Sequence, residues 1–488
     1  MDFHAKSTRR IRHTKIVCTI GPATSDPGVL RAMVEAGMNV ARLNFSHGTH
    51  EQHARVVSAL RDIARELRRP MAIIADLQGP KIRLGELQGV RQLVDGSQLK
   101  LLTHDLPLPD DLLNDELPVR LPQLSEAVSA GSIIMLADGS IRLSVDVTDT
   151  DTGIITCTVV VGGPVSSHKG VNLPDVHFDM PSLTPKDLED LAFAMDQEVD
   201  YVAESFVRSP DDVEQLRVLI ANHPATHKPQ VIAKIETRLA VDRLDDVLAA
   251  SDAVMVARGD LGVELGAAEV PLVQKRMIKR ANELGIPVIT ATQMLESMIS
   301  SPEPTRAEAS DVANAILDGT SAVMLSGETA VGQYPVQVIR VIDKIARAVE
   351  PAMDAPDSYL GANRTTSIPQ ALSDTACEIG ELLDAAAIVV LTETGKTARR
   401  VSRNRPRRPV VAASPDVHAC RRLALDWGTV PILIADLPDA TDEWGKSAAA
   451  ARLSGLIQRG ERVVFTAGTI AGRPGMTNML KVEEFDPV

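Results

Sequence analysis

This sequence of 488 residues has few aromatic residues and no excess of positive charge. Aromatics make up only 2% of the residues, so the hydrophobic core is expected to be mainly aliphatic. The net charge of -14 argues against a general nucleic-acid-binding protein, because phosphate backbones require a basic surface. An anionic substrate would therefore have to be met by cations gathered locally.

Paired cysteines and long apolar runs are also missing. The four cysteines are far apart in the sequence: Cys18, Cys157, Cys377 and Cys420. They form no Cys-x-x-Cys pair, which is typical of a reduced, cytoplasmic protein and predicts no structural zinc site. No apolar run approaches the ~20 residues of a membrane span. Because no apolar segment follows the arginines of residues 9–12, we expect no signal peptide and no membrane partner.

Eight apolar runs of strand length recur along the chain, most of them separated by amphipathic helical patterns. They are residues 15–21, 39–46, 72–79, 201–207, 231–236, 253–260, 288–294 and 322–328. Continuous runs of Val, Ile and Ala indicate strands buried on both faces, and hence a parallel sheet. Eight such βα units in about 250 residues predict a (β/α)8 TIM barrel.

The βα repeat is interrupted twice, and each interruption predicts a further domain. Between the third and fourth runs, turn signals and strands of alternating polarity (141–147 and 153–161) indicate a β-rich lid inserted into the barrel. After residue 350 the pattern becomes that of an open α/β domain, preceded by a linker at 354–369 that is rich in Pro, Gly, Asn and Ser. The expected boundaries are 1–80 and 174–350 for the barrel, 81–173 for the lid and 351–488 for the C-terminal domain.

Charged side chains follow the fifth and sixth expected strands, where the chemistry of a barrel collects. Lys234 and Glu236 end one run, and Gly259 and Asp260 end the next. Mg²⁺ usually takes one or two protein carboxylates and leaves positions for substrate and water. Glu236 and Asp260 therefore predict a divalent-cation site beside an anion, with Lys234 facing the same space. A surface salt-bridge cluster is the alternative, and it fits less well because these groups follow buried strands.

Three other strand ends carry weaker signals. Arg42, Asn44 and Ser46 alternate and are expected to share one strand face, suited to phosphate and ion binding. A stray buried polar residue and a helix cap would explain them as well. Thr292 and Ser326 end the last two strands, where a hydroxyl beside a metal is a plausible proton relay, although a buried Thr more often simply bonds the backbone.

Two loops are ambiguous from sequence alone. Asp76 ends the third strand, and a Gly-Pro turn then leads to Lys81 and Arg83, which solvated turn charges would also explain. The segment TETGKT, residues 392–397, precedes a helix but lacks the GxxxxGK[ST] spacing, so a P-loop is not supported.

Together these motifs resemble the pyruvate kinase family, from about Lys15 to the C-terminus. The matching stretches are ARLNFSHG, GPKIR, KGVNLP (169–174), IAKIET, MVARGDLGVE, TATQMLESM and EPTRAEASDVANAILDGTSAVMLSGETA. The resemblance implies a barrel, a β-rich lid and a C-terminal α/β domain that often binds regulators, usually in a homotetramer. It also implies transfer of the phosphoryl group of phosphoenolpyruvate to ADP, giving pyruvate and ATP in glycolysis.

The resemblance implies roles for the charged residues. Glu236 and Asp260 would hold Mg²⁺ or Mn²⁺, and a second ion would arrive with the nucleotide. Lys234 would neutralise charge on the transferring phosphoryl group. Arg42 and Arg83 would clamp phosphate oxygens, for which a planar guanidinium is well suited.

It also implies how the rest of the substrates is held. The backbone N–H groups of Gly259 and Asp260 would take the substrate carboxylate. Thr292, with Ser326 and water, would relay a proton to the enolate. Asp138 in the lid would close over the site. The positions that match the nucleotide contacts of the family are Asn44, Ser46, His47, Arg83 and Lys169.

The third strand departs from the family pattern. Many members read DTKGPEIR here and need K⁺, which is held by groups equivalent to Asn44, Ser46, Asp76 and a threonine. In this chain Leu77 replaces the threonine hydroxyl, Gln78 replaces a lysine and Lys81 replaces the glutamate. Because an ammonium carries the same charge as K⁺, we predict that Lys81 substitutes for the ion and that activity needs no K⁺.

The C-terminal domain departs as well. Members activated by fructose 1,6-bisphosphate have a basic residue where this chain has Glu393, and a carboxylate there repels a bisphosphate. We expect Lys396, Arg399 and Arg473 to bind a phosphorylated effector with one phosphate, such as AMP or a hexose monophosphate. The expected effector loop comprises Thr392, Thr394, Gly395, Lys396, Thr397 and Arg473.

Two other functions are considered. A metal-dependent aldolase on the same barrel would share the Glu/Asp pair, but not the lid, Lys234 and the C-terminal domain together. A regulatory protein with this fold but without catalytic activity would be expected to lack Lys234, Glu236 or Asp260, and the chain retains all three.

Overall fold

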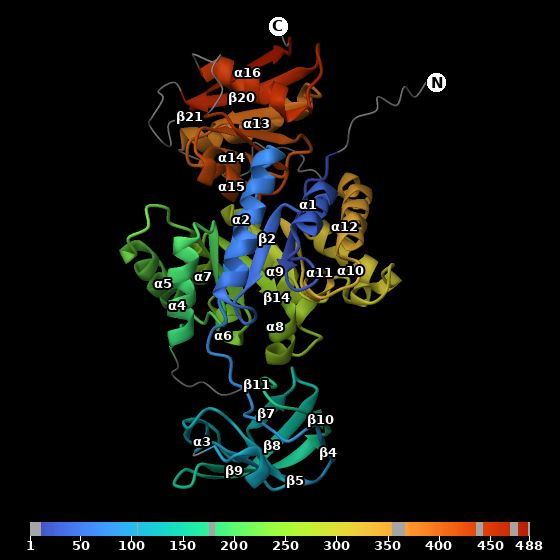
Figure 1. Ribbon diagram of the computed structural model, residues 1–488. Coiled ribbons are helices and arrows are strands. Elements are labelled where there is room, and N and C mark those ends of the chain that lie inside the picture. The colour runs from blue at the N-terminus through green and yellow to red at the C-terminus, as the bar shows by residue number, and fades with distance from the viewer. Residues whose placement is uncertain are drawn as a thin grey trace.

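The computed structural model describes residues 11–104, 106–174, 181–353, 367–435, 443–468 and 477–486. Three layers follow one another along the long direction of the molecule: a small β-rich part, a central barrel and an α/β part that carries the C-terminus (Figure 1). We call the segment between β3 (Ala72–Asp76) and α4 (Pro185–Asp196) the lid domain, and the part from α13 (Ile368–Leu382) onward the C domain. Most of the expected linker, residues 354–366, lies outside the described residues.

Within the described chain, eight parallel strands close into a barrel in the order β1-β16-β15-β14-β13-β12-β3-β2, which confirms the predicted fold class. The strands are β1 (Lys15–Ile20), β2 (Val40–Asn44), β3 (Ala72–Asp76), β12 (Tyr201–Glu204), β13 (Gln230–Ile235), β14 (Ala253–Ala257), β15 (Val288–Ala291) and β16 (Ala322–Leu325). The core inside them is mainly aliphatic, with Tyr201 as an aromatic member.

Helices surround the barrel and bury a second aliphatic cluster against its outer face. The main ones are α1 (Pro27–Ala36), α2 (His50–Glu66), α4 (Pro185–Asp196), α5 (Pro210–Asn222), α6 (Arg238–Asp242), α7 (Leu244–Ala250), α8 (Arg258–Leu265), α9 (Val270–Leu284), α10 (Arg306–Leu317), α11 (Gly327–Ala330) and α12 (Pro335–Val349). Local sequence signals fix their ends. Asp26 caps the first turn of α1, and Gly37 ends that helix at a φ of 119°.

The lid domain has its own hydrophobic core, separate from that of the barrel. Its described strands form a six-stranded sheet, β11-β7-β8-β9-β5-β6, and a two-stranded sheet, β10-β4. They are β4 (Arg91–Leu93), β5 (Gln98–Leu102), β6 (Glu116–Pro118), β7 (Ile133–Leu136), β8 (Ile141–Asp149), β9 (Ile154–Val161), β10 (Gly163–Val165) and β11 (Val171–Asn172), with helix α3 (Leu124–Ala127). Buried and partly exposed residues alternate along the first six positions of β9, as the period-2 pattern predicts.

The C domain contains a sheet whose described strands follow the order β19-β18-β17-β20-β21. They are β17 (Ala387–Leu391), β18 (Val410–Ser414), β19 (Thr429–Leu433), β20 (Arg462–Gly468) and β21 (Thr477–Glu484), with helices α13 (Ile368–Leu382), α14 (Lys396–Arg403), α15 (Val417–Leu423) and α16 (Glu443–Ser454). The sequence pattern ended the series at residues 460–469. The structure adds β21, which pairs antiparallel with β20 at the edge.

The C domain closes the end of the barrel where the strands begin. Ala424 and Leu425 join the core inside the barrel, and the Lys15 ammonium donates to the Thr429 carbonyl at 2.6 Å. The lid lies at the opposite end, beyond the carboxyl ends of the strands (Figure 1). All four cysteines are buried and unpaired, and none of the described helices is long and apolar enough to cross a membrane.

Candidate active site

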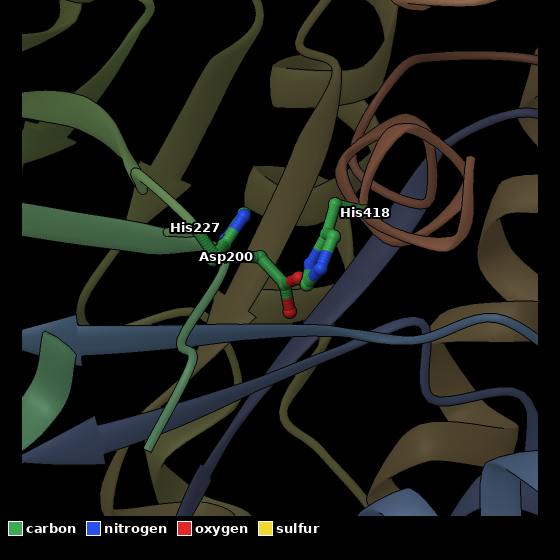
Figure 2. A group of neighbouring side chains, drawn as sticks. All are labelled: Asp200, His227 and His418. Atoms are coloured by element: carbon green, nitrogen blue, oxygen red, sulfur yellow. The ribbon is translucent and has the colours of Figure 1, made fainter. Parts of the chain in front are cut away.

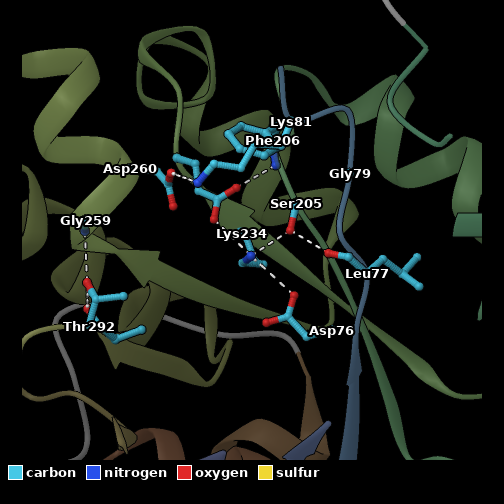
Figure 3. Close-up of polar contacts among 12 residues, drawn as sticks. Asp76, Leu77, Gly79, Lys81, Ser205, Phe206, Lys234, Gly259, Asp260 and Thr292 are labelled. Atoms are coloured by element: carbon cyan, nitrogen blue, oxygen red, sulfur yellow. Dashed lines mark hydrogen bonds and ion pairs between the residues drawn. The ribbon is translucent and has the colours of Figure 1, made fainter. Parts of the chain in front are cut away.

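The polar residues that follow the barrel strands lie in one group (Figure 3). A cavity of about 690 Å³ opens between the two parts. Its walls include Asp138 and Gly139 of the lid and Arg258, Gly259 and Gln293 of the barrel. The cavity therefore lies between the two domains and reaches the polar group at Gly259, whereas Lys234, Glu236 and Asp260 do not line it.

Lys234 is the most tightly held cation of this site. Its ammonium donates to the Ser205 hydroxyl at 2.6 Å, and it lies 3.3 Å from Asp76 Oδ1 and 3.0 Å from Glu236 Oε1. Burial disfavours a charge here, but Asp76 and Glu236 outweigh it and raise the pKa of Lys234. The lysine thus remains a fixed positive charge at neutral pH.

Asp76 anchors two cations rather than facing solvent. One carboxylate oxygen meets Lys234, and the other accepts from Nε of Arg42, which also donates to the Thr19 hydroxyl at 2.9 Å. Burial opposes ionisation of Asp76, yet Arg42 and Lys234 together lower its pKa. Both oxygens are already engaged by side chains, so Asp76 mainly positions Arg42 and Lys234.

Glu236 and Asp260 form a carboxylate pair at the ends of adjacent strands. Glu236 is 1% exposed and accepts the Phe206 N–H at 2.7 Å, whereas the Asp260 side chain is 26% exposed. Burial raises the pKa of Glu236, and the negative charge of Asp260 adds to this effect. Two close carboxylates with oxygen donors turned to one space fit a divalent cation such as Mg²⁺.

Lys81 links the lid to this carboxylate pair. Its ammonium lies 3.3 Å from Asp260 Oδ1 and 3.7 Å from Asp138 Oδ1 of the lid. In the described part of the chain it makes no ion pair with Asp76. The structure therefore places the positive charge of Lys81 beside Asp260, and Lys234 rather than Lys81 beside Asp76.

Thr292 and Gly259 are joined by a hydrogen bond. The Gly259 N–H donates to the Thr292 hydroxyl at 2.9 Å, and that hydroxyl donates to the Ala291 carbonyl at 2.7 Å. Thr292 and Gln293 both have positive φ values, 68° and 53°, and such strain is concentrated at functional sites. A substrate carboxylate at Gly259 would have to replace the Thr292 contact. Ser326, at the end of β16, donates its N–H to Glu328 at 2.7 Å.

The end of β2 corrects one expectation. The strand stops at Asn44, so Ser46 does not share its face and lies instead in a turn in which its N–H donates to Asn44 Oδ1 at 3.2 Å. His47 follows and is exposed. In the sequence, polar residues continue to alternate beyond Asn44, but the backbone turns there, so the alternation no longer describes one strand face.

Arg83 and Lys169 lie where the chain enters and leaves the lid domain. Arg83 donates to the His168 carbonyl at 3.1 Å, and its backbone pairs with Gly170. The Lys169 side chain is exposed. Their position relative to the barrel thus depends on that of the lid.

The expected effector loop is divided in the structure. Thr394 and Lys396 are exposed, whereas Thr392 accepts the Gly395 N–H at 3.1 Å and Thr397 bonds Thr477 at 2.6 Å. Arg473 lies outside the described residues.

The expectation for Arg399 was wrong. Its guanidinium bonds Asp426 at 3.0 Å and reaches the Tyr201 hydroxyl at 3.4 Å, so it serves the joint between the C domain and the barrel.

Ser205 is a site residue that the sequence analysis missed. Its hydroxyl accepts from Lys234 and donates to the Leu77 carbonyl at 2.7 Å, which ties three barrel strands together (Figure 3). The available signal was a serine at the end of an otherwise apolar run, and a serine there often only caps a helix.

Comparison with known proteins agrees with this geometry. A family model described as "Pyruvate kinase, barrel domain" matches residues 11–339, and one described as "Pyruvate kinase, alpha/beta domain" matches residues 370–483. "Pyruvate kinase 2" of Synechocystis sp. is 47% identical over 475 residues, covering 97% of this chain and 79% of that protein. The pyruvate kinase of Geobacillus stearothermophilus is 46% identical over 478 residues, covering 96% and 80%. That of Clostridium acetobutylicum is 40% identical over 478 residues, covering 97% and 99%. The chain belongs to the pyruvate kinase family.

Proposed function

We propose that this phosphotransferase moves the phosphoryl group of phosphoenolpyruvate to ADP around the ammonium of Lys234. The observation that carries the proposal is Lys234, whose side chain is 12% exposed and is held by Ser205, Asp76 and Glu236 beside the Asp260 carboxylate. Phosphoryl transfer depends on positioning and charge neutralisation more than on covalent help from the protein. A fixed cation at the mouth of a barrel meets that requirement.

Glu236 and Asp260 would hold the divalent cation, Mg²⁺ or Mn²⁺. When bound, the ion supplies positive charge that neutralises the substrate and the transferring group. The protein prepares this site at a cost, because Glu236 is buried next to a second carboxylate. Lys234 and Lys81 offset part of the repulsion between the two acids.

The other residues would bind and orient the substrates. Arg42 would hold phosphate oxygens in an orientation set by Asp76, and Arg83 would approach with the lid. The Gly259 and Asp260 N–H groups would take the substrate carboxylate at the start of α8. Thr292, with Ser326 and water, would deliver the proton to the methylene carbon of the enolate. The nucleotide would contact the loops that bear Asn44, Ser46, His47, Arg83 and Lys169, with Asp138 over the site.

Lys234→Met tests the central role. We expect most turnover to be lost while phosphoenolpyruvate still binds, because the lysine acts on charge that develops in the transition state. The measurement pairs the steady-state kcat with a direct titration of substrate binding. An equal loss in binding and in kcat would assign Lys234 to the ground state and contradict the proposal.

We further propose that the enzyme needs no K⁺, because the ammonium of Lys81, between Asp260 and Asp138 rather than beside Asp76, carries the same charge as the ion. Turnover in sodium-only or Tris-only buffer should match that in KCl, and Lys81→Glu should create K⁺ dependence. Lys100→Glu, on β5 of the lid domain, makes the same charge change away from the site and serves as the control. A large stimulation of the unaltered enzyme by KCl would contradict the proposal that it needs no K⁺.

Regulation through the C domain is proposed with a phosphorylated effector at the loop of residues 392–397. The exposed Thr394 and Lys396 support a phosphate site there, whereas Glu393 would repel a bisphosphate. Fructose 1,6-bisphosphate should therefore have little effect on the saturation curve for phosphoenolpyruvate, in contrast to AMP or a hexose monophosphate. Activation by the bisphosphate at micromolar levels would refute this assignment.

We propose that the protein is a homotetramer and that it is cytoplasmic. Four buried, unpaired cysteines suit a reducing compartment. Size-exclusion chromatography with light scattering measures the subunit number directly.

A further inference from the structure

Three potential metal ligands from separate parts of the chain meet at the end of the barrel that faces the C domain (Figure 2). Asp200 immediately precedes β12, His227 lies in the loop before β13, and His418 belongs to α15. One ligand atom from each residue lies within 4.8 Å of the others. The group therefore spans the joint between barrel and C domain, at the opposite end of the barrel from the active site.

Asp200 carries an oxygen that nothing in the described chain satisfies. The side chain is fully buried. Its Oδ2 accepts from Arg61 at 2.9 Å and from the Ile73 N–H at 2.8 Å, whereas Oδ1 has no hydrogen-bond partner among the described residues. A buried, unpartnered carboxylate oxygen is uncommon in proteins and calls for an explanation, for which an ion is one candidate.

The two imidazoles offer the nitrogen atoms that such an ion requires. His227 Nε2 lies 3.0 Å from the Val199 carbonyl, to which it can donate, so that its Nδ1 keeps a free lone pair. A backbone carbonyl in this role is the usual way of orienting a metal-binding histidine. His418 Nδ1 is buried and has no partner in the described part of the chain.

The surrounding charges are balanced and do not exclude a cation. Arg61, Arg421 and Arg422 lie near the group, and Glu198 and Asp416, together with Asp200, equal them in number.

We propose that Asp200, His227 and His418 bind one transition-metal ion of the Zn²⁺ class and thereby fasten the C domain to the barrel. Two nitrogens and one carboxylate oxygen suit Zn²⁺, Co²⁺ or Ni²⁺ rather than Mg²⁺ or Ca²⁺, and leave a position for water. The rings now stack, with centroids 3.8 Å apart and planes 13° apart. Ion binding therefore includes a turn of one ring, so that both lone pairs converge.

The test is a Zn²⁺ titration of the full chain in excess Mg²⁺, which occupies the carboxylate pair of the active site. Competition with a chromophoric chelator measures the ion that is bound. We expect one Zn²⁺ per chain, and an affinity weaker by about tenfold or more in His227→Phe and His418→Phe. Phenylalanine preserves a ring that can stack but offers no ligand atom. His104→Phe, at an exposed position of the lid domain, is the matched control and should bind Zn²⁺ normally.

A second readout keeps the proposal open to refutation if a variant misfolds. Co²⁺ added to the unaltered protein in excess Mg²⁺ should give the visible absorption of nitrogen-ligated Co²⁺, and Zn²⁺ should abolish it by displacement. Absence of that absorption, or equal Zn²⁺ affinity in the unaltered protein and in His227→Phe/His418→Phe, would overturn the proposal. Neither measurement depends on catalytic activity, so the outcome is independent of the proposed function.

Discussion

Glu204 is a buried acid whose removal should stabilise the protein in a pH-dependent manner. It ends β12, where Tyr201 and Ala203 face the inside of the barrel and Val202 faces the helices, so Glu204 lies on the outer side. The side chain is 0% exposed, and neither carboxylate oxygen has a hydrogen bond of good geometry among the described residues, although the Ser182 hydroxyl is near enough to favour the charged form in part. Burial raises its pKa to about 8 from 4.5, and the negative charge of Asp212 acts in the same direction.

The magnitude follows from this shift. The folded protein keeps the proton up to about pH 8, whereas the unfolded chain loses it near pH 4.5. Glu204 therefore costs no stability below pH 4.5, costs more as the pH rises, and reaches its full cost above pH 8. At ~1.4 kcal/mol per pH unit, the cost is ~2 kcal/mol at pH 6 and ~5 kcal/mol at pH 9. Glu204→Gln preserves the shape and removes the titration, so it should recover this difference.

The assay is the melting temperature Tm at pH 5, 6, 7 and 9. At ~2.1 cal/mol/K per residue, the unfolding entropy of a chain of 488 residues is ~1 kcal/mol/K, so each kcal/mol shifts Tm by about 1 °C. This predicts a rise of about 2 °C at pH 6 and of about 5 °C at pH 9 for Glu204→Gln. Glu214→Gln, whose carboxylate is 61% exposed on α5, should show no such trend. A Tm difference that stays constant with pH, or that favours the unaltered protein at pH 9, would refute the reasoning.

Two further substitutions test other buried groups. Ser205→Ala should lower kcat by about tenfold with little change in KM for phosphoenolpyruvate, because Lys234 loses the hydroxyl that fixes its ammonium; an unchanged kcat would contradict this. Lys15→Met loses the hydrogen bond to the Thr429 carbonyl at every pH, so the prediction concerns the trend: its Tm relative to the unaltered protein should be higher at pH 6 than near pH 10. Burial, together with Arg12, lowers the pKa of Lys15 to about 7 from 10.5, so the cost of its charge is complete below pH 7 and disappears towards pH 10.5. An equal Tm difference at both pH values would disprove it.

The barrel could be predicted from sequence because its signal is local. Each strand is buried on both faces and reads as a continuous apolar run, and eight such runs closed as expected. The short strands of the lid domain, such as β11 (Val171–Asn172), were not identified because a segment of two or three residues is too short to show an alternation of polar and apolar residues. Strand β21 was missed because it lies beyond the apparent end of the repeat.

The site was predicted in part. Lys234, Glu236 and Asp260 were found because the ends of adjacent parallel strands must lie together, and the structure brings these three side chains into one group. The partner of Lys81 and the role of Arg399 were not predictable. They depend on contacts between residues more than 170 positions apart in the sequence, which no local pattern records.

The contacts of Arg399 have a mechanical consequence. Its guanidinium reaches the Tyr201 hydroxyl and Gln230 Oε1, two residues that pair across β12 and β13 at the barrel floor. Four residues further along each strand, ~13 Å away, stand Ser205 and Lys234, which are hydrogen-bonded to each other. Hydrogen-bonded strands hardly compress along their length, so β12 and β13 fix the distance between the contacts of Arg399 and the ammonium of Lys234. The position of that ammonium is therefore tied to the joint with the C domain as well as to the residues around it.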